Sequence, residues 1–185
     1  LDTVSPVAIF TPDNATFYVT LDGEEARLNI DLSVVSYVDR AWDSVNRVVT
    51  AQVKTCTNFT KLEGSNSNSC TELGDGWYVV YKNVSYKKCL KMVGDVHLIL
   101  VDGATLNVKD GIYIKEDNTF TVYAQEAGLG KIYAHPGSGP GIGGMKNKTA
   151  GHFVVKGGII DARAGSNRNA GIGGGYDHSG IQSVT

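Results

Sequence analysis

The residues best placed for acid–base chemistry lie near the end of the chain, where acidic side chains are scarce. Asp161 and Asp177 are the only carboxylates after residue 126, and Asp161-Ala162-Arg163 puts a carboxylate and a guanidinium on one face of an expected strand. In some polysaccharide lyases built on a parallel β-helix, an aspartate binds calcium beside an arginine that acts as base. Such sites gather acids from several coils, whereas one coil supplies them here, so we expect no catalytic residues. The alternative, a β-helix polysaccharide lyase or glycoside hydrolase, would use Asp161, Arg163 and Arg168.

Other side chains give little support for a metal or cofactor. None of the four histidines pairs with another at a spacing of two or four residues, so no zinc site is expected. The acidic turns at Asp102-Gly103 and Glu116-Asp117-Asn118 offer the oxygen ligands that calcium prefers, but they lack the repeated Asp-x-Asp pattern of a dedicated calcium loop. We therefore predict no cofactor, with calcium at these turns as the alternative.

Tyrosines are the best candidates for a binding surface. Tyr113 and Tyr123 fall outside the apolar alternation of their strands, so we expect both rings to point outwards. Tyr176, Asp177 and His178 follow at an expected corner. Because sugar rings stack on aromatic side chains while polar neighbours supply hydrogen bonds, these five residues form the predicted ligand site. The expected partners are host or dietary glycans or surface proteins. The alternative is that these tyrosines belong to a half-solvated sheet face that binds no ligand.

The three cysteines, Cys56, Cys70 and Cys89, form no metal-binding motif. A Cys56–Cys70 disulfide would close a loop rich in serine and asparagine in an oxidising compartment, and three free thiols are the alternative. The cysteines alone therefore do not identify the compartment.

Glycine distinguishes the second half of the chain from the first. Of the 23 glycines, nineteen lie between residues 94 and 180, and Gly141-Ile142-Gly143-Gly144 recurs thirty residues later as Gly171-Ile172-Gly173-Gly174. No helix is expected after either copy, as a phosphate-binding loop would require. The glycines are instead expected at corners, where their lack of a side chain permits unusual backbone angles and close approach.

Period-two alternation of apolar residues dominates the chain and predicts strands. A shift of fourteen residues places His97–Val108 over Gly111–Val122, with Leu98 over Ile112 and Leu106 over Phe120. Such a unit cannot bury its apolar face alone and must stack on a neighbour. We therefore predict an all-β fold: a right-handed parallel β-helix (solenoid) in the C-terminal half, capped by an N-terminal β-rich segment. A β-sandwich with glycine-rich hairpins is the alternative.

The glycine content and the apolar alternation divide the chain into three expected segments. Residues 1–40 are expected to be a β-rich segment or the end of a preceding domain, with strands at Thr16–Thr20 and Ala26–Leu32. Residues 41–93 form the β-rich cap, and residues 94–185 form the glycine-rich solenoid. Residues 180–185 read as the beginning of another strand, so we expect the solenoid to continue past the end of the sequence.

Charge and hydropathy exclude several classes of protein. The 17 basic and 19 acidic residues give a net charge of −2, which offers no electrostatic basis for nucleic acid as a partner. No apolar run approaches the length of a membrane span, so no membrane insertion is expected. The start of the chain shows neither a signal peptide nor an initiator methionine, as in an excised segment.

An ordered series of motifs from residue 42 to residue 185 resembles a known kind of protein. Gly94-Asp95-Val96-His97-Leu98-Ile99-Leu100-Val101-Asp102-Gly103 is followed by Ala170-Gly171-Ile172-Gly173-Gly174-Gly175. Together they are similar to the large, glycine-rich, adhesin-like surface proteins of anaerobic gut bacteria. The resemblance implies a non-catalytic, β-helical module at the bacterial cell surface or outside the cell. It implies no catalytic residues, and the ligand and the oligomeric state stay open.

Overall fold

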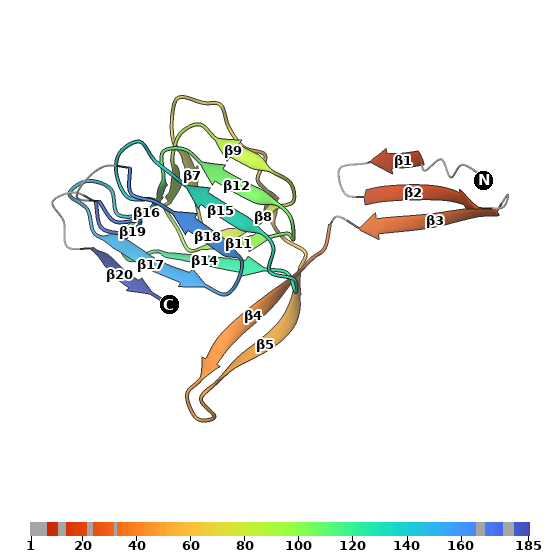
Figure 1. Ribbon diagram of the computed structural model, residues 1–185, viewed down its shortest axis with the longest axis horizontal. Coiled ribbons are helices and arrows are strands. Elements are labelled where there is room, and N and C mark those ends of the chain that lie inside the picture. Colours follow the sequence, from red (N-terminus) through yellow and green to blue (C-terminus); the bar gives the residue numbers. More distant parts are fainter. Residues whose placement is uncertain (1–6, 11–13, 22–23, 32, 166–168, 176–179) are drawn as a thin grey trace. The chain divides into compact units, whose positions relative to one another are not determined.

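The computed structural model describes residues 7–10, 14–21, 24–31, 33–165, 169–175 and 180–185, and every regular element in them is a β-strand (Figure 1). The predicted all-β class is therefore confirmed. The chain divides into two units, Leu1–Val35 with Thr55–Asn58, and Ser36–Lys54 with Phe59–Thr185. Most of residues 41–93 fall in the same unit as residues 94–185. No helix able to span a membrane occurs in the described residues.

The smaller unit contains an antiparallel sheet of three strands. Its strands are β1 (Val7–Phe10), β2 (Asn14–Leu21) and β3 (Glu24–Asp31), in that order. Phe17 pairs with Leu28 across β2 and β3, so both expected strands occur there. The turn that joins them lies outside the described residues.

The larger unit is built on three sheets. The first sheet contains β7 (Thr71–Leu73), β10 (Leu90–Met92), β13 (Ile112–Ile114), β16 (Ile142–Gly143) and β19 (Ile172–Gly173). The second contains β6 (Thr60–Lys61), β8 (Gly76–Val80), β11 (Val96–Leu100), β14 (Thr119–Ala124), β17 (Ala150–Val155) and β20 (Ile181–Val184). The third contains β9 (Val84–Tyr86), β12 (Thr105–Val108), β15 (Lys131–Ala134) and β18 (Ile159–Ala162). Neighbouring strands on these paths are parallel.

From β7 onwards, successive strands fall on the three sheets in rotation, and we call each set of three consecutive strands a rung. In the first sheet Leu90 pairs with Ile112, Ile112 with Ile142, and Ile142 with Ile172. The two Gly-Ile-Gly-Gly copies thus lie side by side on β16 and β19. The fourteen-residue match is not the hydrogen-bonded register, since Leu98 pairs with Val122 and not with Ile112. It superimposes strands of different sheets because all three sheets share one apolar alternation.

The core lies between the three sheets and consists of aliphatic and aromatic side chains that point inwards. Leu98, Leu106, Ile132 and Phe153 are each at most 1% exposed. The rings of Phe120 and Phe153 on adjacent strands stack with their centroids 5.5 Å apart. Burial of these side chains contributes about 1.5–3 kcal/mol each, so the core between the three sheets is a large source of stability.

A disulfide joins Cys70 to Cys89, and the predicted Cys56–Cys70 pairing is therefore wrong. Thr71 and Leu90 are partners in the parallel register of β7 and β10, so the residues just before them lie opposite one another. Their Cα atoms are 4.6 Å apart, within the ordinary range for a disulfide. Cys56 is a free thiol. The pairing follows from the strand register, which cannot be predicted from the spacing of the cysteines in the sequence.

Strands β4 (Val35–Asp43) and β5 (Val48–Cys56) form an antiparallel ribbon. At its base, Val38 pairs with Ala124 at the end of β14, and Arg40 donates a hydrogen bond of 3.0 Å to the carbonyl oxygen of Lys156. Farther along, the ribbon extends away from the three sheets, and Trp42 is 63% exposed (Figure 1). The base of the ribbon therefore covers part of the outer face of the second sheet.

Close contact between rungs explains Gly143 of β16. Gly143 has φ of +151°, and a Cβ atom there would overlap the carbonyl oxygen of Gly173. That oxygen accepts a hydrogen bond of 3.0 Å from the backbone N–H of Gly144. A side chain at residue 143 would therefore force the two strands apart.

Candidate ligand-binding groove beside Tyr113

The outward row of the first sheet positions the candidate site. Glu72, Lys91, Tyr113, Gly143 and Gly173 are neighbours in register on β7, β10, β13, β16 and β19. Side chains point alternately inwards and outwards along each strand, so the side chains of this row face away from the core. On one side of Tyr113 the row has the long charged side chains of Glu72 and Lys91, and on the other side it has two glycines without side chains.

Two tight turns flank this row. In the turn at 115–118, the N–H of Asn118 donates to the carbonyl of Lys115 at 3.1 Å. In the turn at 145–148, the N–H of Lys148 donates to the carbonyl of Met145 at 3.0 Å. The third residue of each turn has positive φ, +65° for Asp117 and +57° for Asn147. After glycine, aspartate and asparagine adopt this conformation most readily, so both residues suit a position where the chain reverses.

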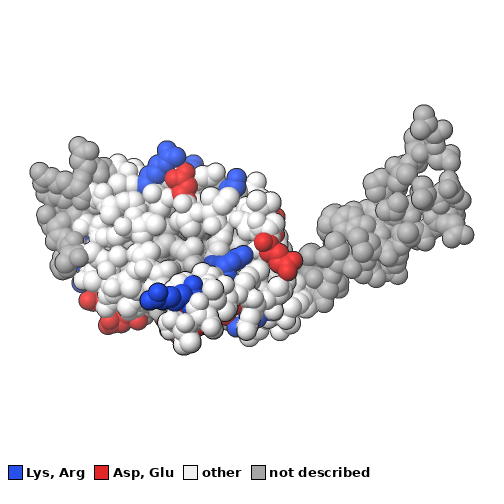
Figure 2. Space-filling view, turned by 60° about the horizontal axis from the view of Figure 1, so that its bottom comes forward, with Lys and Arg blue, Asp and Glu red and all other residues white. Residues whose placement is uncertain are grey.

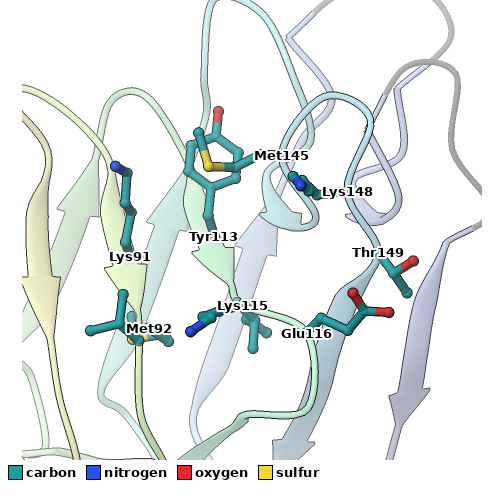
Figure 3. Close-up of a pocket in the computed structure, with 10 residues that line it drawn as sticks. Lys91, Met92, Tyr113, Lys115, Glu116, Met145, Lys148 and Thr149 are labelled. Atoms are coloured by element: carbon teal, nitrogen blue, oxygen red, sulfur yellow. The ribbon is translucent and has the colours of Figure 1, made fainter.

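A groove of about 310 Å³ lies between Tyr113, the turn residues and the ends of the neighbouring strands (Figure 3). Val93 and Met145, which are 40% and 43% exposed, give it apolar walls. A second hollow of about 370 Å³ continues beyond Tyr113 and Met145, which line both. Each volume falls within the range of about 300–1,000 Å³ that is typical of small-molecule sites.

The Tyr113 side chain is half-buried, with its phenol group kept neutral. Burial raises the pKa of Tyr113 above its ordinary value, and the negative charge of Asp110 raises it further. A Cβ atom at Gly139 would lie 3.1 Å from the Tyr113 hydroxyl oxygen, so the glycine leaves room for that hydroxyl. The ring therefore presents an apolar face to the groove and a hydrogen-bonding oxygen at its edge.

Lysines surround the apolar walls. Lys91, Lys115 and Lys148 line the groove together with a single acidic residue, Glu116. In Figure 3, Lys91 and Lys148 lie on opposite sides of Tyr113. By contrast, basic and acidic side chains are scattered over the face drawn in Figure 2, where most of the surface is uncharged.

Tyr123 does not join this site. Its outward side on β14 is covered by Tyr37 of the ribbon, whose ring centroid lies 4.9 Å from its own, and Tyr123 is only 7% exposed. Trp77 stacks on both Tyr123 and His97, at 5.2 and 4.5 Å between ring centroids. Burial raises the pKa of Tyr123 to about 12 and lowers the pKa of His97. The cluster of these four rings fixes the ribbon to the second sheet and leaves little of Tyr123 for a ligand.

Asp161 and Arg163, the residues of the enzymatic alternative, lie on and just after β18 of the third sheet. Arg163 donates two hydrogen bonds of 3.1 Å to the Asp161 carboxylate, and Nε2 of His135 lies 3.0 Å from the same carboxylate. These contacts with Arg163, and then with His135, lower the pKa of Asp161. The arrangement is that of an ion pair at the end of a strand.

The two acidic turns have hydrogen-bond partners of their own. The Asp102 carboxylate accepts hydrogen bonds from the backbone N–H groups of Ala127 and Leu129, at 3.2 and 2.8 Å. Asp117 exchanges hydrogen bonds with the Gln182 side chain. Within the described ranges, no group of three or more His, Cys, Asp or Glu residues is arranged to hold a metal ion.

The remaining predicted residues, Tyr176, Asp177, His178 and Arg168, lie outside the described residues. The structure adds Met145 and the three lysines to the surroundings of Tyr113. They come from three successive rungs, and no sequence motif connects them.

The chain was compared with protein-family models, with curated proteins and with solved structures, and none of them matches it.

Proposed function

We propose that the larger unit is a right-handed parallel β-helix that acts as a non-catalytic, adhesin-like module outside the cell, and that it binds carbohydrate in the groove beside Tyr113. The observation that carries the binding proposal is the half-buried Tyr113 ring with its hydroxyl at the edge of an open, apolar-walled groove.

The rotation of strands among three parallel sheets supports the β-helix. Each rung pairs with the next in register, as in Leu106 with Ile132 and Ile132 with Ile160 on the third sheet. Crossovers between parallel strands of one sheet are right-handed in nearly all proteins, which supports the handedness. The Cys70–Cys89 disulfide supports an oxidising compartment, as expected of a secreted or surface protein.

The groove has the properties that sugar binding needs. A pyranose ring has an apolar face of C–H groups and an edge of hydroxyls, so an aromatic ring with a polar tip complements both. Tyr113 provides that combination, and Met145 adds a polarisable side chain that adapts to irregular surfaces. The two hollows that meet at Tyr113 offer space for more than one sugar unit along a polysaccharide.

The state of Asp161 supports a binding function over catalysis. Its carboxylate is already engaged by Arg163 and His135, and both contacts favour its charged form. A glycosidase acid would instead need a raised pKa and a second carboxylate across the scissile bond.

Affinity electrophoresis in gels containing soluble plant and mucin polysaccharides tests this proposal. Tyr113→Ala should reduce the retardation, and the affinity calculated from it should fall by about tenfold, since stacking on an aromatic ring contributes roughly 1 kcal/mol or more. Tyr133→Ala, which removes an outward tyrosine of the third sheet, is the matched control and should leave binding unchanged. Binding that survives Tyr113→Ala would refute the groove beside Tyr113 as the binding site. An absence of binding to every polysaccharide would refute carbohydrate binding and favour a purely structural stalk.

A further inference from the structure

We infer that the groove beside Tyr113 selects acidic polysaccharide, with Lys91, Lys115 and Lys148 as the residues that recognise its carboxylate or sulfate groups. This inference rests on the proposed carbohydrate-binding function and gives it a ligand class.

The local balance of charge in the groove differs from that of the chain. The chain as a whole has more acidic than basic residues and a net charge of −2. The groove inverts that balance, with three lysines against Glu116, and Lys146 lines the adjoining hollow. A ligand with neutral hydroxyls alone would not need this concentration of cations beside its apolar contact.

The three lysines of the groove are available to a ligand. Within the part of the chain that the structure describes, Lys115 and Lys148 have no ion-pair partner. Lys91 contacts Glu72 at 3.5 Å, but the Glu72 side chain is 59% exposed, so solvent screens this pair. An anionic group that enters the groove can therefore contact lysines without first breaking a strong internal interaction.

The backbone that carries two of these lysines is preorganised. Lys115 and Lys148 occupy the first and last positions of hydrogen-bonded turns. The turn at 115–118 is further held by β17, because the N–H of His152 donates to the carbonyl of Asn118 at 2.8 Å. The backbone from which these lysines project is therefore fixed before a ligand binds, which lowers the entropy lost on binding.

The geometry favours acidic sugars over nucleic acid. The lysines rim an apolar groove around one aromatic ring, so the ligand must offer an apolar face and a charged edge on the same unit, as a uronic acid does. Nucleic acid would bring a closely spaced row of phosphates to a chain of net negative charge. We therefore assign the site to acidic polysaccharide and treat nucleic acid as an outcome that the test must detect.

Polygalacturonate and its methyl-esterified form provide a matched pair of ligands, because esterification removes the charge and keeps the sugar backbone. Isothermal titration calorimetry at low salt should give at least tenfold tighter binding to the acidic form. The difference should shrink in high salt, because the electrostatic screening length becomes shorter. Lys115→Gln with Lys148→Gln should weaken binding to the acidic form by about tenfold, at roughly two- to fivefold per exposed lysine. Binding to the ester should not change.

The control is Lys82→Gln with Lys87→Gln, which makes the same change in net charge at two exposed lysines that line neither hollow. Its binding should equal that of the unmodified protein.

Each other outcome has a distinct meaning. Equal binding to both forms that is lost in Tyr113→Ala would overturn the charge selection and leave carbohydrate binding intact. Failure of both forms and of every sulfated polysaccharide tested would overturn the assignment to acidic polysaccharide; carbohydrate binding itself would fall only if the plant and mucin polysaccharides of the electrophoresis test also failed to bind. A single-stranded oligonucleotide that binds more tightly than polygalacturonate would replace acidic sugar with nucleic acid as the ligand.

Discussion

Replacing Gly143 with alanine should cost about 4 kcal/mol of unfolding free energy. The backbone at this position has φ of +151°, a conformation that costs a residue with a side chain about 1–3 kcal/mol. The new Cβ atom would also overlap the carbonyl oxygen of Gly173, so β16 and β19 would have to separate. Separation weakens two backbone hydrogen bonds, from Gly144 to Gly173 and from Ile142 to Gly171, which contribute about 1 kcal/mol each.

Variants at two other glycines distinguish the cost of backbone strain from the cost of the overlap between strands. Gly103 has φ of +81° and no atom near its Cβ position, so Gly103→Ala should lose about 1–2 kcal/mol from backbone strain alone. Gly137 has neither a positive φ nor a close neighbour, and Gly137→Ala should change stability by less than about 1 kcal/mol.

Urea unfolding followed by circular dichroism measures all three variants. In thermal unfolding, the loss at Gly143 corresponds to roughly 8–16 °C in Tm for a chain of this size. If Gly143→Ala were no more destabilised than Gly103→Ala, the close approach of the two rungs would not be a constraint on this residue, and our account of Gly143 would be refuted.

Two further predictions concern the disulfide and the ring cluster. The double variant Cys70→Ala with Cys89→Ala should lose about 3 kcal/mol of unfolding free energy, the value expected for a closed loop of roughly 20 residues. In urea titrations, a reductant should destabilise the unmodified protein by a similar amount and leave the variant unchanged. Because the pKa of Tyr123 is raised to about 12, the folded protein keeps a phenolic proton between pH 10 and 12 that the unfolded chain loses. Unfolding free energy should therefore fall by about 2 kcal/mol across that range, and Tyr37→Ala should flatten the fall, as phenolate absorbance and urea unfolding would reveal.

Much of the larger unit could be predicted from the sequence because alternation reports the two faces of a strand. It assigned Ile112 and Ile114 to the core, where both are buried, and Tyr113 to the outside, where it borders the groove. It did the same for Tyr123, but which side a ring faces does not say what covers that side. The covering residue, Tyr37, lies on a ribbon far earlier in the chain.

The parts that could not be predicted depend on strand register. The disulfide follows from the pairing of β7 with β10, which spacing between cysteines does not encode. The lysines of the groove are similarly spread over three rungs and meet only because parallel strands bring them together. No local pattern connects Lys91 with Lys148, so a sequence-based search finds the tyrosine and misses the charges around it.

The stepwise pairing of rungs has a consequence for how the chain folds. Paired residues of the first sheet follow one another from 71 to 90, 112, 142 and 172, so each contact closes a loop of moderate and similar length. Loop-closure entropy grows slowly, and the longer loop between Phe120 and Phe153 costs only about 0.5 kcal/mol more than that between Thr71 and Leu90. Along the parallel paths of the three sheets in the described residues, each strand pairs with a neighbour from the preceding or following rung, and the contact of Val38 with Ala124 is a long-range addition to them. The chain can therefore fold vectorially, adding each newly synthesised segment to the one already in place.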